Sequence, residues 1–452
     1  MKNKKDNNPH HILVVGGGAG GLELATALGN KLGKKKKAAI TLIDSALTHL
    51  WKPLLHEVAA GALNAFEDEL GYLGQSHWHH FRFRLGRMDR LDRAKKEVSL
   101  APTLDDNGNE YIPRRTFHYD TLVIAVGSTT NDFAVPDVRE HCMFLDTRKQ
   151  ADHFHQHLLK NYFTAHTQTE PLREGQLHIA IAGAGATGVE LSAELHDSTH
   201  QLSEYGLDQV KPDTDVKITV IDASERILPA LPAKLSAKVK KALEDINIEI
   251  LTSQKIIEAT PDGFKTESGQ LIPAEIKVWA AGIKAPDFLE DIDGLETNRM
   301  NKLVVKPTLQ TTRDENIFAF GDCAACPMGS SLNNPEGRNT TVPPRAQAAN
   351  QQATMLVKTI RLRVRGKTNL PEYRYVDYGS LVNLSNYTTV GNLMGSVSKL
   401  SGAVMIEGVI ARLVYISLYK MHQIALHGYI RMGLTTLANI LTRKAKPRMK
   451  LH

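Results

Sequence analysis

Two glycine-rich turns in this chain have the residue types and spacing that bind the pyrophosphate of a dinucleotide. Both follow the pattern G-x-G-x-x-G, with Gly16, Gly18 and Gly21 in the first turn and Gly183, Gly185 and Gly188 in the second. Such glycines let the chain turn tightly, let a pyrophosphate approach the backbone and let the next helix pack closely. The repeat predicts that the chain holds two dinucleotides.

An acidic residue completes each of these motifs. Asp44 ends the apolar run 39–43, and Asp222 ends the run 216–221. A carboxylate at the end of the second strand of such a module can accept hydrogen bonds from both hydroxyls of a ribose. The order of strand, glycine turn, helix, strand and acid is more specific than a glycine motif alone.

The surrounding elements must position these residues. Apolar runs at 12–15 and 177–182 predict the strands that enter the two turns, and runs at 119–125 and 277–281 predict the strands that close at Gly127 and Gly282. A late strand at 317–320 precedes Asp322 and is expected to return to the first module. The fold class is therefore α/β, with two Rossmann-like dinucleotide-binding domains, the second inserted into the first. The expected domain ranges are 1–130 and 291–375 for the first, 131–290 for the second and 376–452 for a C-terminal domain.

Bulk composition narrows the class of protein. With 452 residues and 42% hydrophobic content the chain can bury a large core. The apolar run near the start of the sequence is too short for a signal peptide, which predicts a cytoplasmic protein. Three cysteines do not make a disulfide framework. Cys323 and Cys326 form a C-x-x-C for which a redox or metal role stays open. His77, His79 and His80 lack carboxylate or cysteine support, so no metal site is predicted.

The last segment of the chain has a different character. Residues 399–452 carry nine Lys and Arg against Glu407 alone, a net +8 that leaves −2 for the remainder of a chain of net +6. Ile406, Ile410, Leu413, Val414, Leu418, Met421 and Ile424 recur at helical spacing, opposite Arg412, Tyr415, Tyr419 and His422. A second helix is expected at 430–441, and neither segment is long enough to span a bilayer. The pattern predicts amphipathic membrane-anchoring helices on an anionic lipid surface, and no nucleic-acid binding.

The whole chain resembles the flavoproteins with two dinucleotide-binding domains and, within them, the type II NADH:quinone oxidoreductases. The motifs that carry the resemblance are GGGAGGLE, HLWKPLLHEVAAG, LVIAVGS, GAGATGVELSAEL, VWAAGIKAPDF, FGDCA, PPRAQAANQ and the basic tail. The resemblance implies a peripheral enzyme on the cytoplasmic face of the cell membrane. It would transfer hydride from NADH to noncovalent FAD and two electrons on to a membrane quinone, without pumping ions.

The resemblance also implies roles for individual residues. The FAD site would comprise Gly16, Gly18, Gly21, Asp44, Lys52, Gly127, Asp322 and Ala346. The NADH site would comprise Gly183, Gly185, Gly188, Glu190, Asp222 and Gly282, where Asp222 favours NADH over NADPH. The quinone site would comprise Gln347, Gln351, Pro53 and Leu54. The catalytic residues would be Glu190, which lies beside the nicotinamide and flavin, together with Gln347 and Gln351.

Alternatives remain at this stage. A soluble FAD-dependent reductase of another acceptor shares both modules, although the cysteine pairs that disulfide reductases need are missing from the first helix and the second module. A non-catalytic NADH-binding flavoprotein has the same motifs. A homodimer is an open alternative to a monomer, and Glu190 also suits a helix first turn without any catalytic role.

Overall fold

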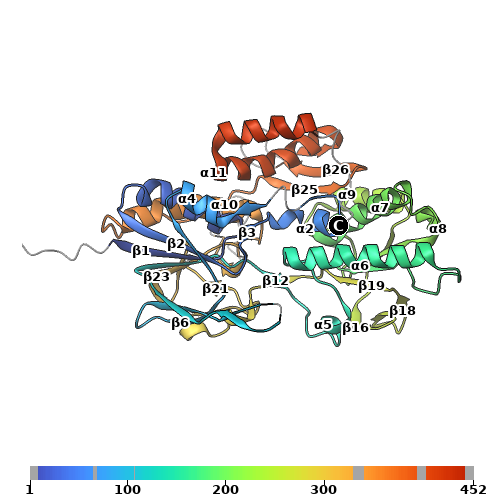
Figure 1. The fold of residues 1–452 in the computed structure, drawn as a ribbon, viewed down its shortest axis with the longest axis horizontal. Coiled ribbons are helices and arrows are strands. Elements are labelled where there is room, and N and C mark those ends of the chain that lie inside the picture. The colour runs from blue at the N-terminus through green and yellow to red at the C-terminus, as the bar shows by residue number, and fades with distance from the viewer. Residues whose placement is uncertain (1–8, 65–68, 106, 329–340, 394–403, 443–452) are drawn as a thin grey trace, which may run out of the picture. The chain divides into compact units, whose positions relative to one another are not determined.

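The computed structural model describes residues 9–64, 69–105, 107–328, 341–393 and 404–442. Its backbone contacts divide the chain into two compact units (Figure 1). The first unit comprises residues 1–51, 69–129 and 284–377, and the second comprises residues 52–68, 130–283 and 378–452. Contacts thus group 52–68 and the C-terminal segment with the second unit. The four domain ranges expected from the sequence stay a prediction.

The first unit is built on a six-stranded sheet in the order β22-β23-β11-β1-β2-β5. β1 is central, and its Val14 pairs in parallel with Leu42 on one side and Val123 on the other. Its last four residues are buried, as in a strand covered on both faces. The six strands are β1 (His10–Val15), β2 (Ala38–Asp44), β5 (Arg82–Leu85), β11 (Thr121–Ile124), β22 (Gln310–Thr311) and β23 (Asp314–Ala319).

Helices α1 and α10 pack closely in this unit, because a Cβ on Gly20 of α1 would meet the Phe320 ring at 2.5 Å and the Ala349 carbonyl oxygen of α10 at 3.2 Å. Helix α10 begins at Ala346 and ends at Arg363. The helices are α1 (Ala19–Leu28), α4 (Tyr72–Trp78) and α10 (Ala346–Arg363), with short turns at Gly29–Gly33, Asp287–Leu289, Ile292–Gly294 and Gly321–Cys323. The smaller strands are β3 (Thr48–His49), β4 (Leu70–Gly71), β6 (Met88–Asp92), β7 (Glu97–Leu100), β8 (Thr103–Leu104), β9 (Glu110–Ile112), β10 (Arg115–His118), β21 (Leu303–Val304) and β24 (Ala324–Ala325).

The second unit repeats this plan. Its parallel sheet has the order β15-β14-β13-β19, and Ile181 of β13 pairs with Val220 and Val278. The strands are β13 (His178–Ala182), β14 (Lys217–Ile221), β15 (Glu249–Leu251), β16 (Ile256–Thr260), β17 (Gly263–Thr266), β18 (Leu271–Pro273), β19 (Ile276–Trp279), β25 (Gly379–Leu384), β26 (Thr388–Leu393) and β27 (Val404–Glu407). A short 3₁₀ turn lies at Lys52–Leu54. The helices are α2 (Leu55–Ala60), α5 (Val138–His141), α6 (Arg148–Thr167), α7 (Ala186–Glu204), α8 (Pro212–Asp215), α9 (Ala233–Glu244) and α11 (Gly408–Thr442). β12 (Thr129–Thr130) and β20 (Ile283–Lys284) lie where the chain passes between units.

The duplicated module predicted from the sequence is present in both units. In each, a central strand leads through the glycine turn into a helix, and the next parallel strand ends beside the first. Each module also contains a three-stranded antiparallel sheet, β10-β7-β6 in the first unit and β16-β17-β18 in the second. The parallel sheets of the two units and the helices that alternate with their strands confirm the predicted α/β fold class.

The C-terminal helix α11 contacts the β25-β26-β27 sheet of the second unit. Gly428 has a non-helical backbone (φ +77°), so α11 consists of two helical segments, drawn in red above β25 and β26 in Figure 1. These correspond to the two helices expected from the sequence, with one correction. Ile406 was placed on the apolar face of the first helix, but it lies in β27 because its backbone pairs with Gly391 of β26. Helix α11 begins only at Gly408.

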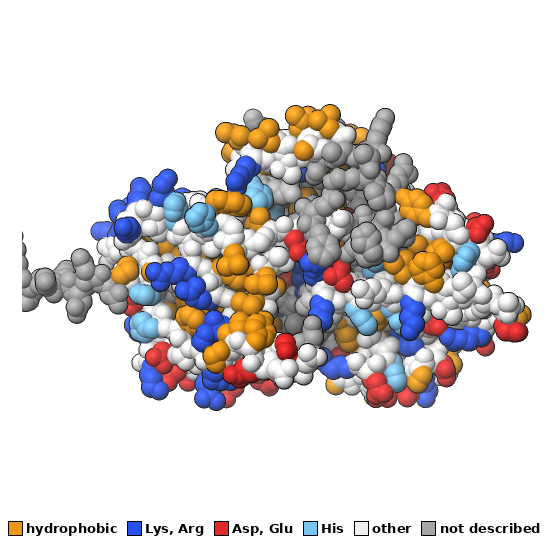
Figure 2. Space-filling view, viewed as in Figure 1, with side chains coloured by type: hydrophobic (Ala, Val, Ile, Leu, Met, Phe, Trp, Pro, Cys, Tyr) orange, Lys and Arg blue, Asp and Glu red, His pale blue; other side chains and the backbone are white. Residues whose placement is uncertain are grey.

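Large apolar side chains cover the exposed face of α11. Tyr415 and Tyr419 are partly buried and His422 is buried, so the aromatic and histidine face packs against the protein. The exposed apolar residues are Val409, Ile410, Leu413, Ile416, Leu418, Met421, Tyr429, Ile430, Leu434, Leu437 and Leu441. They account for the orange side chains at the top of Figure 2. Among the described residues, no helix has the length and apolar character needed to cross a bilayer.

Candidate functional site

The first glycine turn has the backbone geometry that a pyrophosphate site needs. Gly16 has φ +100°, and its N–H donates to the Ile43 carbonyl oxygen at 2.8 Å. A Cβ on Gly16 would overlap the Ala125 carbonyl, and a Cβ on Gly21 would overlap the Gly16 carbonyl oxygen. Around Gly18, in contrast, no atom would lie within 4 Å of a Cβ. The turn is therefore packed on the protein side and open at the N-terminus of α1, where a phosphate group fits.

Asp44 supports this turn from the end of β2. Its carboxylate accepts the Gly17 N–H at 2.6 Å and the Ala46 N–H at 2.8 Å. Burial raises the pKa of Asp44, and these backbone N–H groups oppose the shift. A carboxylate has about four lone-pair directions, so Asp44 keeps acceptor capacity for ribose hydroxyls. The Tyr72 hydroxyl donates to the Gly17 carbonyl oxygen at 2.8 Å, a supporting contact that no sequence pattern indicated.

A small cavity lies beside Asp322 in the same unit. The Ser128 hydroxyl donates to Asp322 at 3.0 Å, and Gln352 accepts the Gly321 N–H at 2.8 Å. Gly127 has φ +71°, with open space where a side chain would be. The cavity is lined by Gly321, Asp322, Ala324, Val342, Pro343, Arg345, Ala348 and Gln352. Ala346 lies at the start of α10 next to this lining.

The first unit thus aligns its polar groups along one edge of its sheet. The glycine turn, Asp44, Gly127 and Asp322 follow the carboxyl ends of β1, β2, β11 and β23, which are neighbours in the sheet. In open parallel sheets ligands bind at this edge. The open turn, the carboxylate and the cavity together fit a long dinucleotide such as FAD.

Lys52, Pro53 and Leu54 group with the other unit. Lys52 forms an ion pair with Asp146 at 3.3 Å, and Leu54 is buried while Pro53 is exposed. These three residues and the first glycine turn therefore belong to different units. Their assignment to FAD and quinone stays a prediction.

The second glycine turn reproduces the first in detail. The Gly183 N–H donates to the Ile221 carbonyl at 2.7 Å, and Gly183 has φ +108°. Asp222 accepts the Ala184 N–H at 2.6 Å and the Ser224 N–H at 2.7 Å. A Cβ on Gly188 would overlap the Gly183 carbonyl oxygen, whereas a Cβ on Gly185 would meet nothing within 4 Å. Gly282 has φ +67° and faces the Phe133 ring, which a Cβ would approach to 2.5 Å. The second unit therefore fits a second dinucleotide.

Glu190 lies in a buried polar cluster on α7 of the second unit. It is 8% exposed, and its carboxylate accepts the Asn383 N–H at 3.0 Å. Its other oxygen lies 4.0 Å from His56 Nδ1. Burial raises the pKa of Glu190 to about 8 and lowers the pKa of His56 to about 4. At neutral pH the contact therefore joins a protonated acid and a neutral imidazole.

Glu194 is a second buried acid one turn along α7. It accepts the Ser385 hydroxyl at 2.9 Å, and burial raises its pKa to about 7. The Nε2 atom of His56 has no hydrogen-bond partner within the described part of the chain. Sequence reasoning singled out neither Glu194 nor His56. The spacing of the two acids, four residues apart on one face of a helix, was the available signal.

The two glutamines of α10 contact the segment that follows the helix. The Gln347 amide donates to Asp377 at 3.3 Å. Gln351 donates to the Val376 carbonyl at 2.8 Å and accepts from the Val376 N–H and the Tyr373 hydroxyl. Both lie on one face of the helix, as their spacing predicts. Gln351 has every hydrogen-bonding direction but one occupied.

The cysteines are buried thiols. Burial raises the pKa of Cys323 to about 11 and the pKa of Cys326 to about 12. The Cys323 thiol donates to the Phe320 carbonyl at 3.3 Å. Reactive and metal-binding cysteines need thiolate character. The protein environment disfavours that character at this C-x-x-C.

Comparisons with known proteins agree with this geometry. The family model for pyridine nucleotide-disulphide oxidoreductases matches residues 10–353. A type II NADH:quinone oxidoreductase from Haemophilus influenzae is 44% identical over 98% of this chain and 100% of its own length. One from Staphylococcus aureus is 30% identical over 85% of this chain and 90% of its own.

Solved structures share the fold at lower identity. The structure of NDH2 from Plasmodium falciparum in complex with NADH has a TM-score of 0.81 at 19% identity and covers 98% of this chain and 100% of its own. The sulfide:quinone oxidoreductase from Aquifex aeolicus has a TM-score of 0.70 at 17% identity and covers 97% and 96%. These proteins therefore share the fold of this chain over nearly its whole length.

Proposed function

This chain belongs to the type II NADH:quinone oxidoreductases, within the pyridine nucleotide-disulphide oxidoreductase family, and we propose how its residues divide the reaction. The chain is a flavoprotein that oxidises NADH and reduces a quinone. The first glycine turn holds FAD and the second holds NADH. The observation that supports this division is the pair of equivalent turns, each with an open glycine and a supporting aspartate.

The residues of the first unit bind and orient FAD without a covalent link. The N-terminus of α1 and the open backbone at Gly18 hold the pyrophosphate, and Asp44 accepts the ribose hydroxyls. Asp322 and Gly127, at the neighbouring strand ends, hold the ribityl chain, and Ala346 starts the helix that covers it. When bound, FAD supplies hydride acceptance from NADH and two-electron transfer to a quinone.

The residues of the second unit bind NADH in the same manner. Gly185 and the N-terminus of α7 hold the pyrophosphate, and Asp222 accepts the ribose hydroxyls, which favours NADH because a 2′-phosphate would meet a negative charge. Glu190 lies one turn further along α7 and is protonated at neutral pH. We therefore assign Glu190 as an acid that holds a proton for the reduction of the quinone, since a quinone gains two protons with its two electrons.

The exposed apolar face of α11 supports attachment to a membrane. Apolar side chains on this face insert among lipid acyl chains, and basic residues of the tail are attracted to anionic head groups. The attachment is peripheral and on the cytoplasmic face, where NADH is available. Quinone then enters from the lipid and meets Gln347 and Gln351, while the quinone role of Pro53 and Leu54 stays a prediction. A homodimer stays an alternative to a monomer.

Gln347 and Gln351 test the acceptor half of this proposal. Substitution of either by alanine is expected to slow the return of flavin absorbance on addition of quinone by tenfold or more, on the order of the 1.4 kcal/mol that one lost hydrogen bond contributes. Bleaching of the same absorbance by anaerobic NADH should stay within about twofold of wild type, and stopped-flow spectroscopy separates the two steps.

Thr354→Ala is the matched control, because Thr354 is exposed on the same helix. Both of its steps should equal those of wild type. Equal slowing of the NADH and quinone steps in Gln347→Ala would contradict a quinone role and indicate a damaged FAD site. Both glutamines also contact the segment that follows the helix, Gln347 at Asp377 and Gln351 at Tyr373 and Val376, so circular dichroism should establish that each variant keeps the wild-type fold.

The buried acid gives a pH dependence of stability. Glu190 keeps its proton in the folded chain up to a pKa of about 8, whereas the unfolded chain releases it near 4.5. The contribution of Glu190 to the free energy of unfolding should therefore fall as pH rises from about 4.5 to about 8 and level off above. Glu190→Gln cannot ionise, so its melting temperature should fall less than that of wild type over this window. The difference should be roughly 2–4 °C for each kcal/mol of destabilisation that the substitution removes.

Differential scanning calorimetry at pH 5 to 9 measures this effect. The slope that remains in Glu190→Gln combines the effect of Glu194, whose pKa is about 7, with the opposite effect of buried histidines such as His56, whose pKa is about 4. Glu204→Gln, an exposed position on the same helix, should follow wild type. If Glu190→Gln and Glu204→Gln have the same pH profile, Glu190 is ionised in the folded protein and cannot hold the proposed proton.

A further inference from the structure

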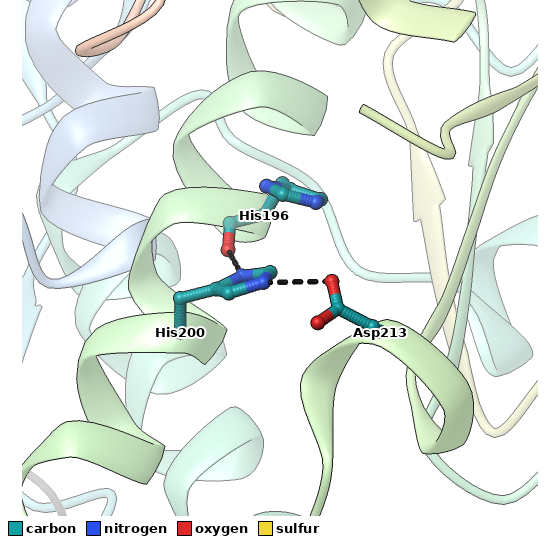
Figure 3. Close-up of side chains that lie close together, drawn as sticks. All are labelled: His196, His200 and Asp213. Carbon is teal, nitrogen blue, oxygen red and sulfur yellow. Dashed lines mark hydrogen bonds and ion pairs between the residues drawn. The ribbon is translucent and has the colours of Figure 1, made fainter. Parts of the chain in front are cut away.

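A cluster of two histidines and an aspartate lies on α7 and α8 of the second unit. His196 and His200 are four residues apart on α7, and Asp213 comes from α8. Figure 3 shows their side chains converging from the two helices. One potential ligand atom from each residue lies within 4.8 Å of the others.

The hydrogen bonds of His200 leave a place for a cation. Its Nδ1 atom lies 2.8 Å from the His196 carbonyl oxygen, and its Nε2 atom lies 3.1 Å from Asp213 Oδ1. A carbonyl oxygen only accepts, so Nδ1 carries the ring proton. In a neutral ring Nε2 then points a lone pair at a carboxylate oxygen. The contact becomes favourable when a second proton or a metal ion lies between them.

His196 has the complementary arrangement. Its Nδ1 atom lies 2.6 Å from the Tyr387 hydroxyl, and its ring centroid lies 4.4 Å from that of His200. Both Nδ1 atoms are therefore engaged by oxygen partners, which leaves the Nε2 atom of each ring as the potential metal donor. Histidines that bind metals usually donate their other N–H to such an outer partner, which fixes the orientation of the ring.

We propose that His196, His200 and Asp213 bind a divalent transition-metal ion of the Zn²⁺, Co²⁺ or Ni²⁺ type. Two imidazoles and a carboxylate suit these ions, whereas Mg²⁺ and Ca²⁺ prefer all-oxygen ligands. Donor atoms around a tetrahedral ion with bonds of about 2.0 Å lie about 3.3 Å apart, so the 3.1 Å pair already has a fitting separation. A ligand atom of His196 lies within 4.8 Å of those of the other two residues, and water completes the coordination because Asp213 is exposed.

The ion would join elements that carry other functions. It would link α8 to α7, the helix that also carries Glu190 and Glu194. Through Tyr387 it would support the β25-β26 turn, which contacts α7 at Glu194 through Ser385 and at Asp197 through Asn386. The site is therefore structural, and a bound ion should raise the thermal stability of the second unit without entering the redox reaction.

Zinc binding to the full-length, FAD-loaded protein tests this site. Isothermal titration calorimetry should show one more Zn²⁺ ion bound per chain in wild type than in His200→Ala or Asp213→Asn. Co²⁺ should give visible ligand-field bands that both variants lose. His157→Ala is the matched control, because His153 and His157 have the same spacing on α6 but belong to no three-ligand cluster among the described residues. This control should keep the full stoichiometry.

The readouts separate binding from folding. Flavin content and circular dichroism establish that each variant is folded, and Asp213→Asn keeps nearly the same shape at an exposed position. Zn²⁺ should raise the melting temperature of wild type and His157→Ala but not of His200→Ala. Equal Zn²⁺ stoichiometry in wild type, His200→Ala and Asp213→Asn would overturn the proposal, as would a loss of the equivalent in His157→Ala alone.

Discussion

Gly21→Val is expected to produce a folded second unit without flavin, whereas Gly188→Val is expected to keep flavin that NADH no longer bleaches. Each glycine lies where a Cβ would overlap a backbone carbonyl oxygen of its own turn, at Gly16 or Gly183. Backbone atoms cannot move aside as a flexible side chain can, so the turn must open. Overpacking of this kind costs roughly 1–3 kcal/mol and displaces the phosphate site.

The two variants are controls for each other, because the turns have the same geometry and differ only in the dinucleotide they are assigned. Absorbance of the purified proteins at the flavin band measures FAD content, and anaerobic addition of NADH measures reduction. Gly71→Ala is a neutral glycine control, with φ −68° and no atom within 4 Å of a Cβ. Loss of flavin in Gly188→Val with retention in Gly21→Val would reverse the assignment of the two sites.

Polar substitution of the exposed α11 face is expected to move most of the protein from the membrane fraction to the soluble fraction. Ile410, Leu413, Ile430 and Leu434 are 63–82% exposed, so their replacement by glutamine leaves the folded core nearly unchanged. A fully buried apolar side chain contributes roughly 1.5–3 kcal/mol. Loss of four such contacts, even with partial insertion, should lower membrane affinity by roughly a hundredfold or more.

A salt wash distinguishes the contribution of apolar side chains to membrane binding from the contribution of basic residues. Wild type should stay with membranes in a high-salt wash, because screening weakens only the attraction to anionic lipid. The double variant Ile257→Gln, Leu271→Gln is the control, since it removes exposed apolar residues from β16 and β18 of the same unit. It should sediment like wild type. Sedimentation of the fourfold α11 variant with membranes would contradict attachment through this face.

The modules could be predicted because their determinants are local in sequence. Gly16, Gly21 and Asp44 act within one strand-turn-helix-strand unit, where backbone sterics at the turn allow few alternatives. The same holds for the second unit, so the duplication, the α/β class and the two supporting aspartates followed from spacing alone. The first segment of α11 was also visible as a helical period, but Ile406 was misassigned because strand pairing with β26 overrides periodicity at the edge of a sheet.

The remaining features depended on contacts between segments distant in sequence. Burial raises the pKa of Glu190, and the groups that Glu190 meets, His56 and the β25 backbone, lie more than 100 residues away on either side in sequence. Tyr72 reaches the first glycine turn, and Asp213 reaches His196 and His200, only after the chain has folded. Sequence spacing determines which residues share a local turn or helix face. Which side chains are desolvated, and which meet across elements, is set by packing, because burial and charge interactions depend on distance in space.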